Sequence, residues 1–349
     1  MASVITNKNK KNYMINGNFD YWQRGTTLTP TPNGFVSYLA DRFALYEDGT
    51  SVLNYDQSTD VPNSNSLYSA KVTVGTAGTS SAAQSAFFLQ RVEGKDFKPL
   101  IGKTFTLSFY VKSSITGIYC LNFRNNASDK SYVAEYTINS ANTWEKKSIT
   151  IVHEGTGVWE KDENVGIRIG WFLSVGSNYH TTKDAWQDGI FLGTSAQTDF
   201  INNAAATWQI SQVMLNEGAV AGPFQTAGVN TEGEIALCQR YYEKSYYSED
   251  APGTATPVGA TMWKNSNGGA AGIEIRHTQS FLVEKRTFNP TMSWWDLGGG
   301  SGQFTVDIIN GRVIGGGAFS TSNKGFIGDL NTNVAGVKTQ FHWAVDAEL

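Results

Sequence analysis

The sequence predicts an all-β protein: a jelly-roll β-sandwich, followed by a short helix and a second, smaller β-sandwich. Short apolar stretches with an alternating pattern recur along the 349 residues, and turn residues separate them. Charged residues make up 17%, below the roughly 25% usual for soluble domains, whereas Gly, Asn, Ser and Thr are plentiful. A chain of this length can hold two hydrophobic cores. The balance suits sandwiches built from short strands and many turns.

The stretch 12–25 (NYMINGNFDYWQRG) concentrates aromatic and apolar residues around an Asn-Gly-Asn turn. Glycine and asparagine tolerate the positive φ that a bulge or tight turn requires. We therefore expect a first core strand that bends at Asn16 and Gly17, with Trp22 as a large core residue. A loop rich in Pro, Gly and Asn follows at 26–34.

The remaining strands of the first sandwich follow at short intervals. The clearest is 103–113 (KTFTLSFYVKS), whose alternate residues are apolar and fall on one face. A long excursion at 176–206 interrupts the pattern, and we expect its own aromatic residues to pack it. Other strands are predicted at 41–46, 51–56, 67–74, 86–92, 117–124, 131–138, 144–152, 165–175 and 207–216.

One helix is predicted, beginning at Thr231 and ending near Tyr246. Thr231 and Glu234 form a capping-box pair, because the hydroxyl can accept from an early amide while the carboxylate reaches back. A lone amphipathic helix between two β domains is expected to fill their junction or, alternatively, to make an oligomer contact. The residues assigned to this role are Leu237, Tyr241 and Tyr242.

The rest of the chain again has a strand pattern, after a linker-like stretch at 248–257. Its glycine-rich loops at 298–302 and 315–317 are poor phosphate loops, because no Lys-Ser/Thr follows and no helix begins there. Strands are predicted at 272–277, 280–286, 291–296, 303–310 and 340–347. The predicted domains are an arm at 1–11, a jelly roll at 12–228, a connecting helix at 229–247 and a C-terminal sandwich at 248–349.

The first eleven residues form a polar arm with three lysines, Lys8, Lys10 and Lys11, among asparagines. Such an arm is either a frayed terminus or a docking tail that orders on a partner. We expect a docking arm, whose positive charge would suit an acidic groove on a neighbouring subunit.

Charge and composition exclude several function classes. The formal net charge of -4 gives no general attraction to nucleic acid or to an anionic membrane. No run approaches the roughly 18 apolar residues of a membrane span, so no membrane insertion is expected. The two cysteines, Cys120 and Cys238, lie in apolar settings typical of buried free thiols.

Nothing in the sequence identifies a catalytic centre. The four histidines have no partner at metal-ligand spacing, and no G-x-S-x-G elbow occurs. A glycosidase needs only two suitably placed carboxylates, which leaves a glycan-degrading enzyme as an alternative hypothesis. We expect no enzyme, no catalytic residue and no cofactor.

Three motifs carry a resemblance to a known family. An opening N-G-x-F-x-x-W-Q-R-G precedes A-D-R-[FW], here residues 40–43. Residues 208–224 fit W-x-[IL]-x-x-V-x-L-x-E-G-x-x-x-x-P-F, and residues 234–242 fit E-x-x-L-C-Q-R-Y-Y. These motifs bracket residues 12–242, and the chain resembles a family of bacteriophage virion proteins with a carbohydrate-binding-module-like jelly roll.

The resemblance implies a virion surface structural protein, of tail-fibre or tail-associated type or attached to the capsid. It implies assembly in the host cytoplasm, docking on other virion proteins and, because such proteins sit on three-fold or six-fold surroundings, a homotrimer. It also implies possible adhesion to host-surface polysaccharide. A free-standing carbohydrate-binding module is a further alternative.

The resemblance also directs attention to glycan and calcium sites. Glycan sites use aromatic faces, and Trp159 and Trp186, flanked by charged or amide residues, are the candidates for exposure, with core packing as the alternative. Modules of this kind often hold a structural calcium between an acid after N-G-x-F and another near the closing strand. Asp20 matches the first place, but Gln212 stands at the second, so the acidic pair is incomplete.

Overall fold

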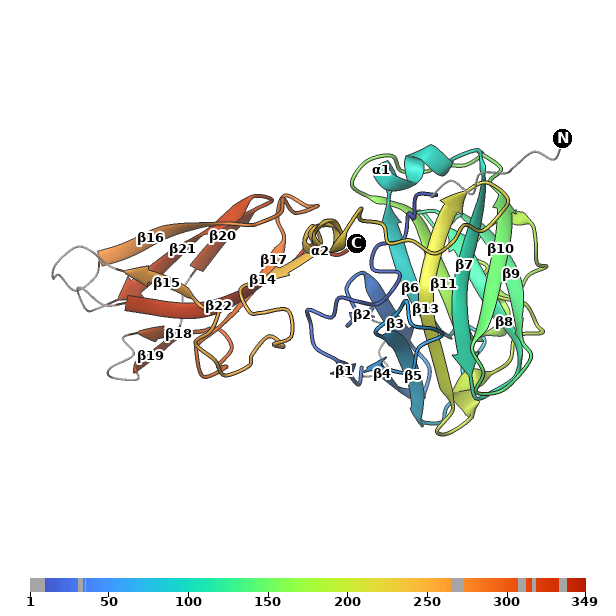
Figure 1. Cartoon of the computed structure of the whole chain (residues 1–349), viewed down its shortest axis with the longest axis horizontal. Helices are drawn as coiled ribbons and strands as arrows, with labels where there is room; N and C mark the ends of the chain where they lie inside the picture. Colours follow the sequence, from blue (N-terminus) through green and yellow to red (C-terminus); the bar gives the residue numbers. More distant parts are fainter. Residues whose placement is uncertain are drawn as a thin grey trace. The chain divides into compact units, whose positions relative to one another are not determined.

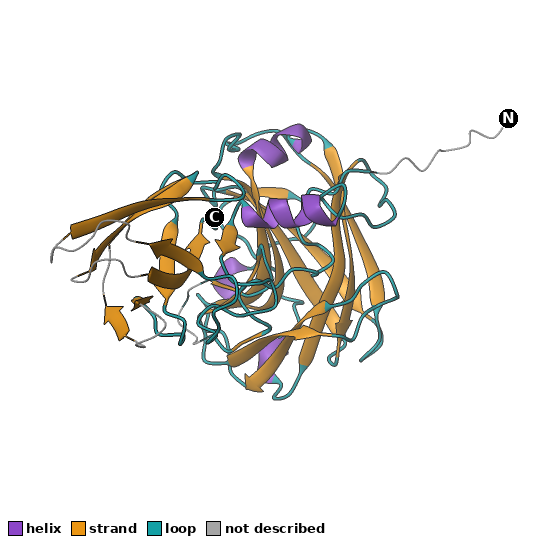
Figure 2. Ribbon diagram, turned by 60° about the vertical axis from the view of Figure 1, so that its left-hand side comes forward, coloured by secondary structure: helices purple, strands orange, loops and turns teal. Residues whose placement is uncertain are grey.

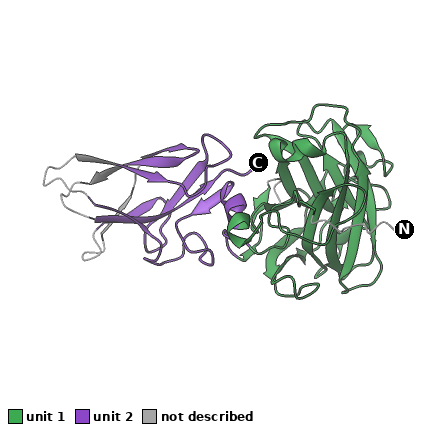
Figure 3. Ribbon diagram, turned by 45° about the horizontal axis from the view of Figure 1, so that its top comes forward, with its two compact units in different colours: residues 1–20, 26–234, 349 green, residues 21–25, 235–348 purple. Residues whose placement is uncertain are grey.

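The structure is a computed structural model, and it describes residues 10–30, 34, 36–264, 273–306, 312–315, 318–332 and 338–349. Its architecture is all-β, as the sequence predicts, with short helices between the strands (Figures 1 and 2). The chain divides into two compact units (Figure 3). Unit 1 comprises residues 1–20, 26–234 and 349, and unit 2 comprises 21–25 and 235–348. The sequence predicted that the jelly roll comprises residues 12–228 without interruption. In the structure, residues 21–25 belong to unit 2 instead.

Unit 1 is a sandwich of two antiparallel sheets. Strands adjacent in a sheet are seldom consecutive in the chain, so the chain crosses repeatedly from one sheet to the other, as in a jelly roll. The first sheet has the order β1 (Thr27–Leu28), β4 (Val52–Ser58), β5 (Ser69–Thr76), β13 (Thr207–Glu217), β7 (Thr104–Ser113) and β10 (Glu145–Val152). The second has the order β12 (Trp186–Asp188), β9 (Lys130–Ile138), β8 (Gly117–Arg124), β11 (Val165–Val175), β6 (Ser85–Glu93), β3 (Phe43–Glu47) and β2 (Ser37–Tyr38).

Aromatic side chains fill the space between these two sheets. Phe88 of β6 lies 5.3 Å from Tyr55 of β4 and 5.7 Å from Trp208 of β13, measured between ring centroids. The ring of Trp171 on β11 also contacts Phe88, at 6.4 Å. Such ring pairs add to the burial of apolar area. The predicted inward face of β7 is confirmed, because Phe105, Leu107, Phe109 and Val111 are all fully buried.

The opening stretch is buried, but it is not a strand. Residues 12–25 form turns, with φ near 59° at both Asn16 and Phe19. Met14 and Phe19 are fully buried, as is nearly all of Trp22, which belongs to unit 2. The strand prediction was wrong because clustered aromatic residues indicate burial and do not by themselves distinguish a strand from a packed turn.

Most predicted strands of unit 1 are confirmed to within a few residues, and 117–124 and 165–175 coincide with β8 and β11. The very short strands β1, β2 and β12 were not predicted, and β12 lies inside the predicted excursion. Four short helical segments were not predicted either: α1 (Gly94–Phe97), η1 (Lys98–Leu100), η2 (Ser177–Tyr179) and η3 (Phe200–Asn202). Both cysteines are buried and neither forms a disulfide, as predicted.

The predicted helix exists as α2 (Thr231–Gln239), but it ends earlier than expected, and residues 242–244 form a strand. Its cap also differs from the prediction. Asn230 Oδ1 accepts from the Gly233 amide at 2.8 Å, an N-cap bond one residue before Thr231. The carboxylate of Glu234 instead accepts from the amides of Asn16 and Gly228.

Unit 2 contains a six-stranded and a three-stranded sheet. Its core includes Trp263, Phe304, Phe326 and Phe341, which come from both sheets. The first sheet contains β14 (Tyr242–Lys244), β15 (Thr261–Lys264), β17 (Thr291–Trp295), β18 (Gln303–Val306), β19 (Arg312–Gly315) and β22 (Lys338–Asp346). The second has the order β16 (Ile273–Ser280), β21 (Gly325–Thr332) and β20 (Ala318–Ser322).

One strand predicted for unit 2 is wrong: residues 281–286 are bends and irregular chain, not the strand predicted at 280–286. Residues 307–310 of the strand predicted at 303–310 lie outside the described residues, as do residues 316 and 317 of the second glycine loop. The sequence analysis did not predict β14, β15, β19, β20 and β21.

Candidate functional site

The motif residues of unit 1 contact one another and hold the fold together. The Asn12 side chain bonds the backbone of β13 at Val213 and Leu215, and the Val213 amide donates to Gly17 O at 2.7 Å. A Cβ on Gly17 would lie 2.0 Å from Val213 O, so the position requires glycine. The Asn16 side chain donates to Asp41 O at 3.0 Å. These motif residues therefore make structural contacts within unit 1.

The motif residues of unit 2 have the same character. Gln23 Nε2 donates to Tyr242 O at 3.1 Å. The Arg24 guanidinium lies 3.8 Å from the centroid of the Tyr242 ring and pairs with Asp346 at 3.0 Å. Tyr242, predicted at a junction or oligomer contact, is thus buried within unit 2.

A chain excursion packs over part of the outer face of the seven-stranded sheet. Leu192 of this excursion is buried in a cluster with Phe87 of β6 and Phe172 of β11. The half-buried Tyr46 stacks on Phe87 with 4.7 Å between ring centroids. Of the aromatic residues expected to pack the excursion, Phe200 is fully buried and Phe191 is partly buried against this cluster.

Three arginines lie side by side on the same outer face. Arg168 of β11 is directly opposite Arg91 of β6 on one side and Arg124 of β8 on the other. Residues directly opposite in an antiparallel pair share a face, with Cβ atoms roughly 5 Å apart. We call Arg91, Arg168 and Arg124 the arginine row.

The arginine row has few acceptors. Arg168 donates to the neutral oxygens of Ser128 and Asn126, at 3.3 and 3.2 Å. Arg91 donates to the Tyr38 hydroxyl at 3.2 Å and to the Leu349 main-chain oxygen. Arg124 has no hydrogen bond, and no Asp or Glu forms an ion pair with the row, within the part of the chain that the structure describes.

The environment of the row disfavours positive charge. Burial, followed by the charges of the neighbouring Arg168 and Arg91, lowers the pKa of Arg124 to about 10. Burial, followed by the charge of Arg91, also lowers the pKa of Arg168. The Nε atoms of all three arginines are buried and have no hydrogen-bond partner in the structure. The row is thus a set of like charges with unused donors.

The row lines a cavity of about 220 Å³. Tyr46 and Tyr179 lie on its wall and are half-buried. Asp48 also lines the cavity, but its carboxylate accepts from the Tyr46 hydroxyl at 3.0 Å and from the Ser85 amide at 2.7 Å. The acid is therefore held by neutral donors, while Arg124 remains available. The other lining residues are Val36, Phe87, Leu89, Ile190 and Leu192.

The two tryptophans predicted as glycan contacts lie together in unit 1. Trp159 is only 5% exposed, so its predicted exposure was wrong, and its Nε1 donates to Thr156 O at 2.7 Å. Trp186 is half-buried, and its Nε1 donates to Val152 O at 2.9 Å. Their ring centroids are 5.4 Å apart, and His153 contacts both rings. Most of this cluster is packed interior.

Asp20 and Gln212, the positions considered for calcium, do lie in one polar network. Both oxygens of Asp20 accept from Asn18 Nδ2 at 3.1 Å, and Ser66 connects Asn18 to Gln212 Nε2. Burial raises the pKa of Asp20, and the Asn18 bond opposes this shift. Calcium takes six to eight oxygens, usually with several carboxylates. One carboxylate among amide donors does not fit such a site.

The arm is described only from Lys10 onward, and Lys8 lies outside the described residues. Lys10 Nζ donates to Val220 O at 2.6 Å, and Lys11 Nζ lies 4.6 Å from the centroid of the Tyr13 ring. Both lysines line a cavity of about 600 Å³ with the loop 225–229.

Of the residues predicted at the junction or oligomer contact, Leu237 is half-buried and Tyr241 is fully buried.

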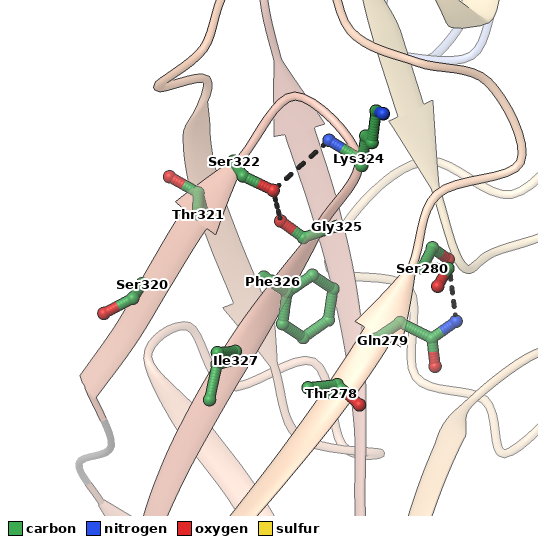
Figure 4. A pocket seen from close by; sticks show the side chains of 10 residues that line it. All are labelled: Thr278, Gln279, Ser280, Ser320, Thr321, Ser322, Lys324, Gly325, Phe326 and Ile327. Carbon is green, nitrogen blue, oxygen red and sulfur yellow. Dashed lines mark hydrogen bonds between the residues drawn. The ribbon is translucent and has the colours of Figure 1, made fainter.

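Unit 2 has a cavity of about 290 Å³ along β16, β20 and β21 (Figure 4). Hydroxyl residues dominate its lining, and several bond locally, as when Ser322 Oγ donates to Gly325 O at 3.1 Å. Lys324 is its only charged lining residue. None of the buried polar side-chain atoms that lack a partner among the described residues belongs to this lining, so we assign the cavity no function.

The described residues contain no cluster of three or more His, Cys, Asp or Glu side chains suited to a metal ion. Among them, no helix has both the length and the apolar character needed to cross a bilayer.

Sequence reasoning missed the arginine row because its members are 33 and 44 residues apart in the chain (124 to 91, and 168 to 124). A weak signal was present. Each arginine interrupts an apolar strand: FFLQRV, CLNFR and VGIRIG. A charged side chain at such a place is unusual.

No family model matches this chain, and no curated protein matches it. Among solved structures, the enzymatically active domain of tailspike protein 4 of bacteriophage CBA120 is similar over 59% of this chain and 21% of its own, with 16% identity and a TM-score of 0.33. A family 4 carbohydrate-binding module is similar over 58% of this chain and 98% of its own, with 17% identity and a TM-score of 0.33.

A family 61 module in complex with β-1,4-galactotriose is similar over 60% of this chain and 99% of its own, with 12% identity and a TM-score of 0.30. This chain therefore spans about a fifth of the tailspike domain and nearly the whole of each module. These likenesses are distant.

Proposed function

We propose that this chain is a bacteriophage virion surface protein that docks on the particle, at the tail or the capsid, and binds a host-surface glycan through unit 1. The three motifs that resemble virion proteins support the location. The cavity on the outer face of the seven-stranded sheet supports the binding role, because it combines aromatic rings, hydroxyls and an unpartnered arginine. Aromatic walls with a few polar groups are typical of small-ligand sites.

The observation that carries the binding role is the polarity of this cavity. Polar groups in a folded interior are normally satisfied by the chain. The Arg124 side chain has no hydrogen bond within the described residues, and the Nε atoms of Arg91 and Arg168 are also buried without a partner. A ligand with hydrogen-bond acceptors would complete the site.

The proposal is tested with the full chain and with surface polysaccharides extracted from bacteria that the phage infects, both acidic and neutral. We expect saturable binding by biolayer interferometry. We also expect antibodies against the chain to label intact particles in electron micrographs. Absence of binding to every polysaccharide, together with unlabelled particles, would contradict the proposal.

The protein is proposed to bind its glycan without cleaving it. Reducing ends measured during the same incubations should not increase above those of the polysaccharide alone. A steady increase would instead support the glycan-degrading enzyme.

The proposal includes a homotrimer joined to other virion proteins through the arm. Light scattering on the full chain should give three times the chain mass. Replacing Lys8, Lys10 and Lys11 together by alanine should weaken attachment to particles if the arm docks on an acidic surface. A monomeric full chain would contradict self-assembly and favour a free-standing module.

A further inference from the structure

We propose that the arginine row binds the acid group of an anionic saccharide, a sugar carrying a carboxylate or a phosphate. The inference rests on the proposed glycan binding and specifies its chemistry. It places Arg124 at the centre of recognition, with Arg168 and Arg91 supplying further positive charge.

The first step is the energetic cost of the row. Like charges directly opposite each other on neighbouring strands destabilise a sheet. The register creates two such pairs, Arg168 with Arg91 and Arg168 with Arg124. Neutral residues at these positions would avoid the cost, and no Asp or Glu among the described residues forms an ion pair with the row. An external anion would offset it.

The second step is the number of unused donors. A guanidinium has five N–H groups in a planar fork, which matches the oxygens of a carboxylate or phosphate. Arg124 uses none of them within the described chain, and the acceptors of Arg168 are neutral. The fork therefore favours a bidentate oxyanion over a neutral hydroxyl.

The third step is the surroundings of the row. The cavity of about 220 Å³ is smaller than the roughly 300–1,000 Å³ of common ligand pockets, so it suits a single sugar residue. The Tyr46 and Tyr179 rings offer apolar surface beside the charges. Partial burial makes the electrostatic interactions stronger than at an open surface.

A nucleic acid is a poorer fit for the same charges. The chain has a net charge of -4, and the row is confined to one small cavity instead of extending along a surface. Binding to a phosphate backbone usually draws on many exposed cations.

The test is calorimetric titration of the full chain with four probes: glucuronic acid, glucose 6-phosphate, glucose and inorganic phosphate. We expect one or both acidic sugars to bind at least tenfold more tightly than glucose and inorganic phosphate. Comparing the two acidic sugars distinguishes a carboxylate ligand from a phosphate ligand. Equal binding of inorganic phosphate and the acidic sugars would overturn the saccharide part of the inference.

Variants assign the effect to the row. Arg124→Gln should weaken the acidic sugar at least tenfold, and Arg124→Lys, which keeps the charge but loses the fork, should restore it only in part. Lys71→Gln, which removes one positive charge from β5 of the other sheet, is the matched control and should leave binding unchanged. Equal affinity of the wild type and Arg124→Gln for the acidic sugars would overturn the inference.

The polysaccharide experiment separates this inference from the proposed function. If the chain binds neutral host polysaccharides but no acidic one, the inference fails while glycan binding stands. If it binds neither class, the proposed glycan binding fails. Thermal melts of each variant verify that any loss of affinity occurs in a folded protein.

Discussion

Two cation sites in this molecule, one buried and one partly buried, are built in opposite ways. In unit 2, Lys285 Nζ donates to Glu243 Oε2, Gln239 O and Val283 O, each at 2.6 Å, so all three of its donors are used. In unit 1, the arginine row forms no ion pair with an Asp or Glu among the described residues, and the Arg124 side chain has no acceptor there. A buried cation matched by the chain stabilises the fold. A row left unmatched is available to a ligand.

The two sites also differ in what surrounds the charge. Burial lowers the pKa of Lys285, but the charge and hydrogen bond of Glu243 oppose this shift. For Arg124, burial and the two neighbouring arginines all act in the same direction. The difference predicts that removing a charge will destabilise unit 2 and stabilise unit 1.

The largest expected effect follows from removing the acid of the matched pair. Glu243→Gln leaves the Lys285 ammonium buried without a counter-charge and should lower the free energy of unfolding by about 3–5 kcal/mol. Urea unfolding followed by tryptophan fluorescence measures it. Glu249→Gln, at an exposed position of the same unit, is the control and should change little. A loss below about 1 kcal/mol would show that Lys285 does not depend on its acid.

A buried histidine provides a third case, because protonation would make it a buried cation without an acidic partner. His153 is 3% exposed, and its Nδ1 accepts from the amides of Gly102 and Gly155 at 3.2 and 2.9 Å. Burial lowers its pKa to about 4, with Glu154 opposing the shift. Because the folded pKa lies below the ordinary value of 6.5, this contribution to stability is present above pH 6.5 and is lost as the pH falls toward 4.

The expected loss over this window is on the order of 2 kcal/mol. Unfolding free energies measured at several pH values across the window test it. His153→Gln, which cannot titrate, should remove this part of the pH dependence, although the variant itself is less stable. An unchanged pH profile in His153→Gln would assign the dependence to other groups.

A smaller effect of opposite sign is expected at the arginine row. Arg124→Met removes one like-charge pair and an unsatisfied donor while keeping an apolar stem, and it should raise stability by about 0.5–1 kcal/mol in the absence of ligand. Thermal unfolding compares it with the wild type. A clear loss of stability would mean that Arg124 has a structural role.

The smallest effect concerns salt. Added sodium chloride screens repulsion between partly exposed charges, so it should stabilise the wild type by a few tenths of a kcal/mol relative to Arg124→Met. Parallel melts at low and high ionic strength measure this difference. Identical salt responses of the two proteins would indicate that the row is not repulsive.

Local sequence pattern determined much of the fold. The alternating apolar residues of β7, β8 and β11 predicted those strands to within a residue at most, because side-chain alternation is a local property of a strand. The low charge content and many turn residues predicted the all-β class. The motif around Gly17 predicted a special backbone position, and the close approach of Val213 O explains the need for glycine.

Only the tertiary structure decided where the candidate site lies. The arginine row depends on which strands are neighbours and on their register, and both are set by pairing between residues far apart in the chain. The exposure of Trp159 was misjudged for the same reason, since polar neighbours in sequence do not reveal that His153 and Trp186 cover its ring. Sequence determined the strands, and long-range packing determined which side chains meet and which charges remain unmatched.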